Sequence, residues 1–368
     1  MLSKWQYEVL TTGDREAWRS TVEAIPARDI FFTPEYLIPF EHLSGNTAHL
    51  FVFGDGTNYI ICPYFLRRIN DLPFYQEFPL NSATEYFDIV SPYGYSGPLA
   101  YVKSQAYQLE LWQEYLSSFH QYCQQTRIVC EFARLNPFAG NQHYLQELTN
   151  GVRPNNPITY LDLTVPEDEL WGGLNRGNRS NINKARRAGV SIDLCKDDRH
   201  LQHFYRLYKS TMRRNNASEW YYFSPDFWNE SFTLLDDKIT LFCAGYNNTI
   251  IAAASFLHEG ETVHYFLGGS DSNYLALRPN NLLMYQAILW AKSQGYKFFN
   301  LGGAYGDNDD LARFKAAFSK LTITFYTYRM IHNKSVYDEL CQNHQAYYLM
   351  LGQQACNTNF FPQYRTEN

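Results

Sequence analysis

Residues 298–318 read FFNLGGAYGDNDDLARFKAAF, which predicts a buried strand, a glycine turn, an acidic helix cap and a short helix. Asp309 or Asp310 suits the N-cap position. On the expected helix one face carries four residues at i, i+3, i+4 and i+7: Leu311, Phe314, Lys315 and Phe318. An ammonium on an apolar face needs a partner or a cleft, because its burial is otherwise costly. The alternative is that the lysine stem packs there while its charged head reaches water.

Three further motifs precede this stretch. They are RSNINKARRAGV (179–190), TMRRNNASEWYYF (211–223), and HYFLGGS (264–270) followed by LRPNNLL (277–283). In this order the four motifs resemble the Fem-type (FemABX) branch of the GNAT-like acyltransferases, a family that also includes BioF2-like acetyltransferase domains. Its members form peptidoglycan bridges or belong to surface-polysaccharide gene clusters. The resemblance covers roughly residues 30–325.

Composition limits the class of protein. With 368 residues, 18% of them charged and 17% aromatic, the chain is long enough for two globular domains. Its net charge of −6 argues against DNA as a partner, because a large nucleic-acid footprint needs many basic groups. Contact with one end of an RNA or with a small phosphorylated donor remains compatible with this charge.

The cysteines and the N-terminal residues predict a cytoplasmic protein. Seven cysteines without a CxxC pair give neither a disulfide framework nor a zinc spacing, so we expect free thiols in a reducing compartment. The first residues, MLSKW, carry no long apolar run of the kind that begins a signal peptide. The longest apolar run, IIAAA at 250–254, is too short for a transmembrane segment.

The order hairpin, glycine loop, helix, strand occurs twice. In the first half it comprises strands 49–53 and 59–65, loop 91–98, a helix with Leu109, Trp112, Leu116, Phe119 and Cys123 on one face, and strand 127–135. In the second half it comprises strands 240–244, 250–256 and 263–267, a glycine loop from Gly268, helix 280–294 and strand 298–301. The repeat predicts an α/β (α+β) fold with two similar lobes, each a mixed twisted sheet flanked by helices, as the resemblance also implies.

The lobes are expected to meet at a polar Gly/Pro/Asn stretch, residues 150–157. We therefore expect a first lobe at 1–155 and a second lobe at 156–330, which carries the basic helix and the Phe-Lys motif. The remaining residues, 331–368, include a helical stretch, and in the family such a tail folds back onto the first lobe.

Basic residues mark candidate phosphate contacts. Between Arg176 and Arg187 five basic residues follow one another without an acid, which indicates either phosphate binding or a solvated helix face. Arg179 and Lys184 match the basic motif of the family. Arg214 aligns with an arginine that contacts the acceptor's phosphate in Fem-type enzymes; alternatively, it satisfies carbonyls at the end of its own helix.

Two loops complete the candidate substrate-binding residues. Loop 91–98 (SPYGYSGP) is not a GxSxG nucleophile turn. In the family the glycine- and tyrosine-rich loop shapes the cleft wall, and the resemblance therefore implies substrate-binding roles for Tyr93 and Tyr95. Pro279 starts a helix whose backbone N–H groups could face an anion. GNAT enzymes that use acetyl-CoA carry a glycine-rich pyrophosphate loop there, and LRPNN departs from that pattern.

Metal chemistry finds no support in the sequence. It has no HExxH, CxxC or paired-carboxylate spacing, and Asp307, Asp309 and Asp310 are explained by helix capping rather than by a calcium loop. His49, His258 and His264 lie in or beside strands, where packed histidines are expected.

The functional hypothesis is direct acyl transfer to an amine, which requires alignment and charge stabilisation but no covalent enzyme nucleophile. Lys315 would supply positive charge to the reacting oxygen or to the donor's phosphate, and Phe314 would help form the donor channel, as the Phe-Lys pair does in the family. The resemblance thus implies a cytoplasmic enzyme without a permanently bound cofactor. It would move an aminoacyl group from the 3′ end of aminoacyl-tRNA to an amine on an envelope precursor, such as a peptidoglycan precursor.

Two other functions stay open. Family members that act on nucleotide-linked muropeptide use a lysine early in the first lobe, and the corresponding segment 31–42 has none. The segment EFARLNP (131–137) looks like the variant of polysaccharide-cluster relatives, which favours an acyl-CoA or acyl-carrier-protein N-acyltransferase acting on an amino sugar. The last alternative is a catalytically inactive module that binds a nucleotide or an RNA end.

Overall fold

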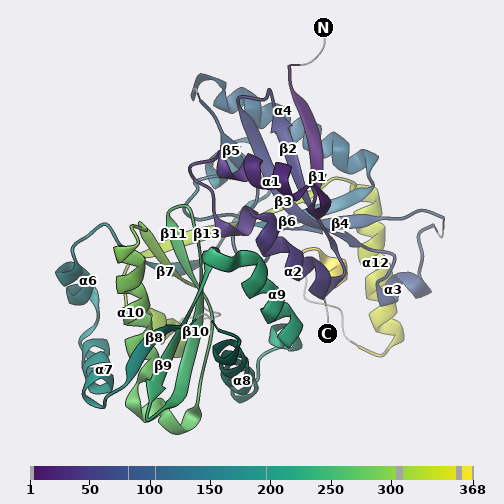
Figure 1. Ribbon diagram of the computed structural model, residues 1–368. Coiled ribbons are helices and arrows are strands. Elements are labelled where there is room, and N and C mark those ends of the chain that lie inside the picture. Colours follow the sequence, from purple (N-terminus) through teal and green to yellow (C-terminus); the bar gives the residue numbers. More distant parts are fainter. Residues whose placement is uncertain are drawn as a thin grey trace. The chain divides into compact units, whose positions relative to one another are not determined.

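The structure is a computed structural model that describes residues 4–81, 83–103, 105–195, 197–303, 310–353 and 359–366. The chain divides into two compact units (Figure 1). The first comprises Met1–Ile25, Phe31–Asn155 and Phe325–Asn368, and the second Pro26–Ile30 and Asn156–Thr324.

A mixed sheet with the strand order β1-β2-β3-β4-β6-β13 forms the centre of the first unit, and β5 pairs with β3. Neighbouring strands are antiparallel except for β4 and β6, which run parallel. The strands are β1 (Gln6–Thr11), β2 (Thr47–Gly54), β3 (Tyr59–Arg68), β4 (Phe87–Val90), β5 (Leu99–Tyr101), β6 (Ile128–Arg134) and β13 (Thr322–Ile331). The division between the units falls within β13.

The helices of the first unit are α1 (Arg15–Glu23), α2 (Pro34–Ser44), α3 (Pro73–Glu77), α4 (Gln108–Gln125), α5 (Gln142–Leu148) and α12 (Lys334–Met350). The predicted apolar face of α4 is correct at Trp112, Phe119 and Cys123, which are buried in the core of this unit. It is wrong at Leu109, which is exposed. Leu111 and Tyr115 are buried instead, so the buried face is rotated relative to the predicted one in the first turns.

The C-terminal segment is fastened to the first unit through Asp88 of β4. Its fully buried carboxylate accepts hydrogen bonds from Arg67 Nε (2.7 Å), Arg365 Nε (2.6 Å) and Tyr364 Oη (3.0 Å). Burial acts to raise the pKa of Asp88, but the two guanidinium groups outweigh it and hold the pKa below its ordinary value. One carboxylate therefore connects β4 with the end of the chain.

The second unit contains a mixed sheet with the order β7-β12-β11-β10-β9-β8. All neighbours are antiparallel except β11 and β12, which are parallel. The strands are β7 (Val152–Asp162), which also crosses the division between the units, β8 (Ser191–Cys195), β9 (Ile239–Tyr246), β10 (Thr249–Glu259), β11 (Thr262–Ser270) and β12 (Phe298–Gly302).

Helices α8 and α10 cover opposite faces of this sheet (Figure 1). The helices of the unit are α6 (Glu167–Gly173), α7 (Arg176–Arg187), α8 (Asp198–Arg214), α9 (Pro225–Leu235), α10 (Pro279–Ser293) and α11 (Asp310–Ala316). α10 is buried on most sides, as its apolar sequence predicts. Ala252 and Ala254 belong to the same core cluster as α10, whereas Gly269 faces α8.

Gly268 and Gly269 lie inside β11, so the prediction of a glycine loop beginning at Gly268 is wrong. A Cβ on Gly269 would stand 2.4 Å from the carbonyl carbon of Leu207 and from the nitrogen of Tyr208 in α8. Glycine is therefore required because the helix backbone packs directly on the strand.

The predicted repeat of hairpin, helix and strand is confirmed, without the glycine loop expected from Gly268 in its second half. β2, β3 and β4 are followed by α4 and then by β6, which pairs in parallel with β4. β9, β10 and β11 are followed by α10 and then by β12, which pairs in parallel with β11. Each unit is therefore a mixed α/β lobe of the same construction.

Candidate active site

The two parallel strand pairs, β4–β6 and β11–β12, differ in how the chain continues beyond their carboxyl ends. In the first unit the chain beyond β4 stays hydrogen-bonded to the β6 side, since Ser91 N donates to Phe132 O (2.9 Å) and Ser96 N to Arg134 O (2.7 Å). In the second unit the described pairing of β11 with β12 ends at His264 and Asn300, while β11 continues to Ser270 along β10. Carboxyl ends of parallel strands that part in this way are a common place for ligands in α/β sheets.

Lys315 lies at this point. Only 6% of its surface is exposed, and its ammonium donates to the carbonyl oxygen of Gly303, directly after β12. The lysine therefore does not extend its head into water; it is buried and holds a backbone carbonyl. Residues 304–309, including the predicted capping residue Asp309, lie outside the described residues, and Asp310 is the first residue of α11.

The apolar face predicted around Lys315 is partly correct. Phe314 packs edge-on against Phe318, with ring centroids 5.1 Å apart, and Phe318 is buried just beyond the end of α11. Leu311 in the first turn is instead exposed. Helix α11 thus presents Phe314 and Lys315 together but does not bury its whole predicted stripe.

Asn178 joins three helices beside Lys315. Its buried amide donates to Ala317 O after α11 (3.1 Å) and accepts from Asn281 Nδ2 of α10 (2.9 Å). Asn175 caps α7 by accepting from Asn178 N, and its own N–H donates to Ala317 O (3.0 Å). The N-termini of α7 and α10 are therefore fixed against the end of α11.

The start of α10 is joined in turn to the end of β11. Asn280 Nδ2 donates to Ser270 Oγ (3.2 Å), and Arg214 Nη1 donates to Ser270 O (3.1 Å). Arg278 precedes Pro279 in a left-handed conformation (φ +61°), and its side chain does not cap α10. The first backbone N–H groups of α10 thus lie close to the end of β11, an arrangement that suits an anion.

The basic residues predicted from sequence occupy different environments. Arg179 Nη1 donates to backbone carbonyls at the end of α6, including Gly172 O (3.0 Å) and Leu174 O, so this guanidinium stabilises a helix C-terminus. Lys184 is exposed on α7. Arg214 contacts Ser270 and, through Nη2, Thr211 Oγ1 (3.3 Å), rather than the last carbonyls of its own helix.

Tyr93 and Tyr95 belong to the first unit. Tyr93 packs against Phe40, and its carbonyl accepts from Tyr36 Oη (2.7 Å). Tyr95 makes edge contacts with Phe31 and Phe325, with ring centroids 6.0 and 5.4 Å apart. The structure therefore places Phe314, Lys315, Arg179, Lys184 and Arg214 in one unit and the two tyrosines in the other.

Tyr265 supplies a hydroxyl beside the parting strands. It follows His264 in β11, and a Cβ on Gly268 would stand 2.7 Å from its hydroxyl oxygen. Burial raises the pKa of Tyr265 to about 12, so the hydroxyl keeps its proton near neutral pH. It can donate a hydrogen bond to a developing negative charge but does not serve as a base at that pH.

Asn178, Asn280, Asn281 and Tyr265 were not predicted as functional residues. The sequence does contain a signal, because Asn175 and Asn178 flank the start of a basic helix and Asn280 and Asn281 follow Pro279. Nothing in that pattern reveals that the two helix starts meet.

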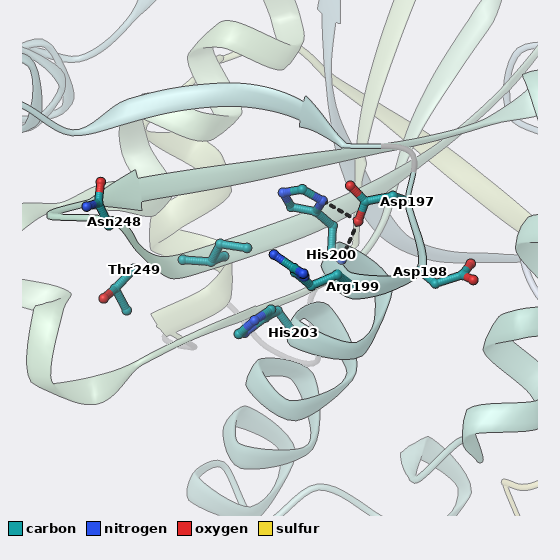
Figure 2. Close-up of a pocket in the computed structure, with 8 residues that line it drawn as sticks. Asp197, Asp198, Arg199, His200, His203, Asn248 and Thr249 are labelled. Carbon is teal, nitrogen blue, oxygen red and sulfur yellow. Dashed lines mark hydrogen bonds and ion pairs between the residues drawn. The ribbon is translucent and has the colours of Figure 1, made fainter.

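A separate hollow of about 720 Å³ lies at the N-terminus of α8 (Figure 2). Its lining includes Asp197, Arg199, His200 and His203, and His200 Nδ1 is 2.6 Å from Asp197 Oδ1. Arg214 is at the opposite end of this helix, roughly 24 Å away at 1.5 Å per residue. None of the predicted site residues lines the hollow, so we do not assign the reaction to it.

Two general properties of the described residues bear on the chemistry. No group of three or more His, Cys, Asp or Glu side chains among them is arranged to hold a metal ion. Within the same ranges, no helix combines the length and apolar character needed to cross a bilayer.

Comparison with known proteins identifies the fold. A family model described as an acetyltransferase (GNAT) domain matches residues 175–316. Among solved structures, FemX is similar over 90% of this chain and 99% of its own, with a TM-score of 0.68 and 14% identity. No curated protein matches the sequence.

Two further structures resemble the chain over most of its length. The C-terminal domain of a putative lysylphosphatidylglycerol synthetase from Agrobacterium fabrum aligns over 92% of this chain and 98% of its own, with a TM-score of 0.53 and 14% identity. A conserved protein of unknown function from Bacteroides thetaiotaomicron aligns over 88% and 99%, with a TM-score of 0.54 and 13% identity. Residues 175–316 thus match a GNAT acetyltransferase domain, and the chain as a whole has a Fem-like fold built from two GNAT-like lobes.

Proposed function

We propose that this chain transfers an aminoacyl group from the 3′ end of an aminoacyl-tRNA to an amine on a cell-envelope precursor. The observation that carries the proposal is the buried Lys315 ammonium, held at the end of β12 where β11 and β12 part. In this proposal the acyl donor enters where the two strands part, next to this charge.

The reaction requires no covalent enzyme intermediate. The acceptor nitrogen attacks the ester carbonyl carbon, the bond from that carbon to the ribose oxygen breaks, and the amine loses a proton, so that an amide and a free hydroxyl result. Lys315 supplies positive charge to the carbonyl oxygen or to the donor's phosphate, and the Tyr265 hydroxyl, which keeps its proton, donates a hydrogen bond to the developing charge. Phe314 lines the donor channel.

Phosphate binding is assigned to the start of α10 and its surroundings. The α10 N-terminus offers backbone N–H groups, and Arg214 is fixed beside it through Ser270. Lys184 is exposed on the neighbouring helix α7 and remains available to a flexible phosphate chain. Arg179 contributes indirectly, because it orders the turn that precedes α7.

The relatives support aminoacyl transfer to an envelope component. The motifs of the sequence point to the Fem-type family, and FemX shares the fold over nearly the whole chain. A second neighbour is named as a lysylphosphatidylglycerol synthetase, a name that describes a lysyl group joined to a lipid. That name supports an aminoacyl donor, and the shared fold is compatible with one.

One observation favours a second candidate, N-acylation of an amino sugar with an acyl thioester donor. The matching family model describes an acetyltransferase domain. Against a thioester of coenzyme A stands the α10 start, where Arg278 and Pro279 replace a glycine-rich pyrophosphate loop.

Label transfer distinguishes these functions. The purified chain is incubated separately with radiolabelled aminoacyl-tRNA, acyl-CoA and acyl-carrier protein, each with nucleotide-linked muropeptide or an amino-sugar nucleotide as acceptor. Transfer from aminoacyl-tRNA alone supports the proposal, and transfer from a thioester alone supports the second candidate. Binding of tRNA without transfer from any donor would indicate a binding module and contradict both.

A further inference from the structure

Three polar residues are buried together where β11 and β12 part. Asp29, His264 and Asn300 are exposed over 3%, 3% and 1% of their surfaces, and all belong to the second unit. His264 and Asn300 face each other in the last pair of the β11–β12 register. Burying polar groups is costly unless they are hydrogen-bonded, so their arrangement needs a physical reason.

The hydrogen bonds of these residues have one consistent direction. Asn300 Oδ1 accepts from Gly302 N (2.7 Å), so the amide nitrogen of Asn300 is the atom that faces His264 Nδ1 (3.1 Å). His264 Nδ1 therefore accepts, and Nε2 carries the proton that it donates to Asp29 (2.9 and 3.0 Å to the two carboxylate oxygens). Both ring nitrogens are engaged, so His264 does not take a proton from a substrate.

This series of hydrogen bonds ends beside Lys315. Gly302 has φ +77°, a conformation that favours glycine, and the next residue, Gly303, supplies the carbonyl that accepts from Lys315 Nζ. Asp29, His264 and Asn300 thus fix the turn that carries the acceptor of the ammonium.

We propose that Asp29, His264 and Asn300 are positioning residues, which hold the Lys315 ammonium through Gly302 and Gly303. The proposal rests on the function proposed above for Lys315 but concerns residues outside the Phe-Lys motif. The strand pair has its own backbone hydrogen bonds, and apolar side chains would fill these positions at a lower desolvation cost. A series of hydrogen bonds that runs in one direction to Lys315 explains why polar residues occupy these buried positions.

Two amide substitutions at His264 each keep one of its two hydrogen bonds, to Asp29 or to Asn300, and remove the other. The Asn amide oxygen is reached from Cβ through as many bonds as His Nδ1, so His264→Asn keeps an acceptor for Asn300 and loses the donor to Asp29. The Gln amide nitrogen is reached through as many bonds as His Nε2, so His264→Gln keeps the donor to Asp29 and loses the acceptor for Asn300. Both variants remove one buried hydrogen bond of the ring, and they therefore serve as matched controls for each other.

The first measurement does not depend on activity. The native proteins are treated with trace acetic anhydride, and acetylation of Lys315 is read by peptide mass spectrometry relative to the exposed Lys320. Because Asn300 transmits the position of the ring to Gly302, Lys315 should react about tenfold faster in His264→Gln than in the wild type, the change expected for one lost buried hydrogen bond, and His264→Asn should show a smaller increase through the lost bond to Asp29. Wild-type protection of Lys315 in folded His264→Gln would overturn the proposal.

A second variant covers the case in which His264→Gln does not fold. Asn300→Ala leaves the bond between Asp29 and His264 intact but frees Gly302 N, and it should likewise expose Lys315 to acetylation by about tenfold relative to the wild type. Unchanged protection of Lys315 in folded Asn300→Ala would also overturn the proposal.

The second measurement uses the transfer reaction once a donor is known. His264→Gln should lower kcat and leave KM within about threefold, because it displaces a group that acts in the transition state. In a Lys315→Met background the same substitution should cost nothing further, since a positioning residue acts only through the group it holds. Additive losses in this double-mutant cycle would contradict the proposal, and failure of the wild type to transfer from any donor would refute the proposed function while leaving the acetylation test valid.

Discussion

Replacing Lys315 with methionine separates a catalytic role from a packing role. Methionine keeps the unbranched stem and removes the ammonium that donates to Gly303 O. Losing a hydrogen bond from a charged donor costs about 1.5–3 kcal/mol, and removing a buried charge returns desolvation free energy of similar size. We therefore expect the free energy of unfolding to change by less than about 2 kcal/mol, which corresponds to a few degrees in Tm.

The rate should respond far more strongly than the stability. Losing one preorganised electrostatic contact to a developing charge typically lowers kcat by about 10²–10³-fold. Lys315→Arg should also be slow, because a planar guanidinium does not replace a compact ammonium in a site with 6% exposure. The assay is single-turnover transfer at saturating donor together with a thermal melt, and Lys320→Met, at an exposed position, is the control. Full activity in a folded Lys315→Met protein would refute the catalytic role.

Three further predictions concern stability. Asp88→Asn should lower the free energy of unfolding by about 3 kcal/mol near neutral pH, because it leaves two arginines without their carboxylate. Because the folded pKa of Asp88 is lowered, the greater stability of the wild type should vanish in urea titrations as the pH falls through that pKa. Burial lowers the pKa of His258 to about 4, so the free energy of unfolding of the wild type should fall by up to about 3 kcal/mol as the pH falls from 6.5 towards 4. A stability that does not change over this pH range, or that changes equally in folded His258→Gln, would contradict this. Gly269→Ala should cost about 1–3 kcal/mol in a denaturant melt, because its Cβ would meet the backbone of Leu207, and an unchanged midpoint would show that α8 can shift without cost.

The sequence predicted the elements of the fold because its periodic and turn signals are local. The two hairpins, the buried helix at 279–293 and the strand at 298–302 all occur, and their repeated order was sufficient to indicate two lobes. The same local signals misplaced Gly268 and Gly269 in a loop. Their role depends on the backbone of α8, which lies some sixty residues earlier in the sequence.

The candidate site was predictable only in part, for the same reason. Helical spacing indicated that Lys315 faces the core, and its burial agrees with that. Helical spacing could not indicate the partner of the ammonium, because Gly303 lies across a turn. Asn178 connects α7 with α10 and α11 over more than a hundred residues of sequence, and such long-range hydrogen bonds leave no periodic signal.

The most direct test of the central claim is the nature of the bond that is formed. The aminoacyl ester of tRNA is cleaved by mild alkali, whereas an amide survives it. Wild-type protein incubated with aminoacyl-tRNA labelled in the amino acid and with an amine-bearing envelope precursor should produce alkali-stable label on the precursor, at a rate at least about a hundredfold above that of Lys315→Met. Label that remains alkali-labile, or equal yields with wild type and Lys315→Met, would contradict direct acyl transfer to an amine at this site.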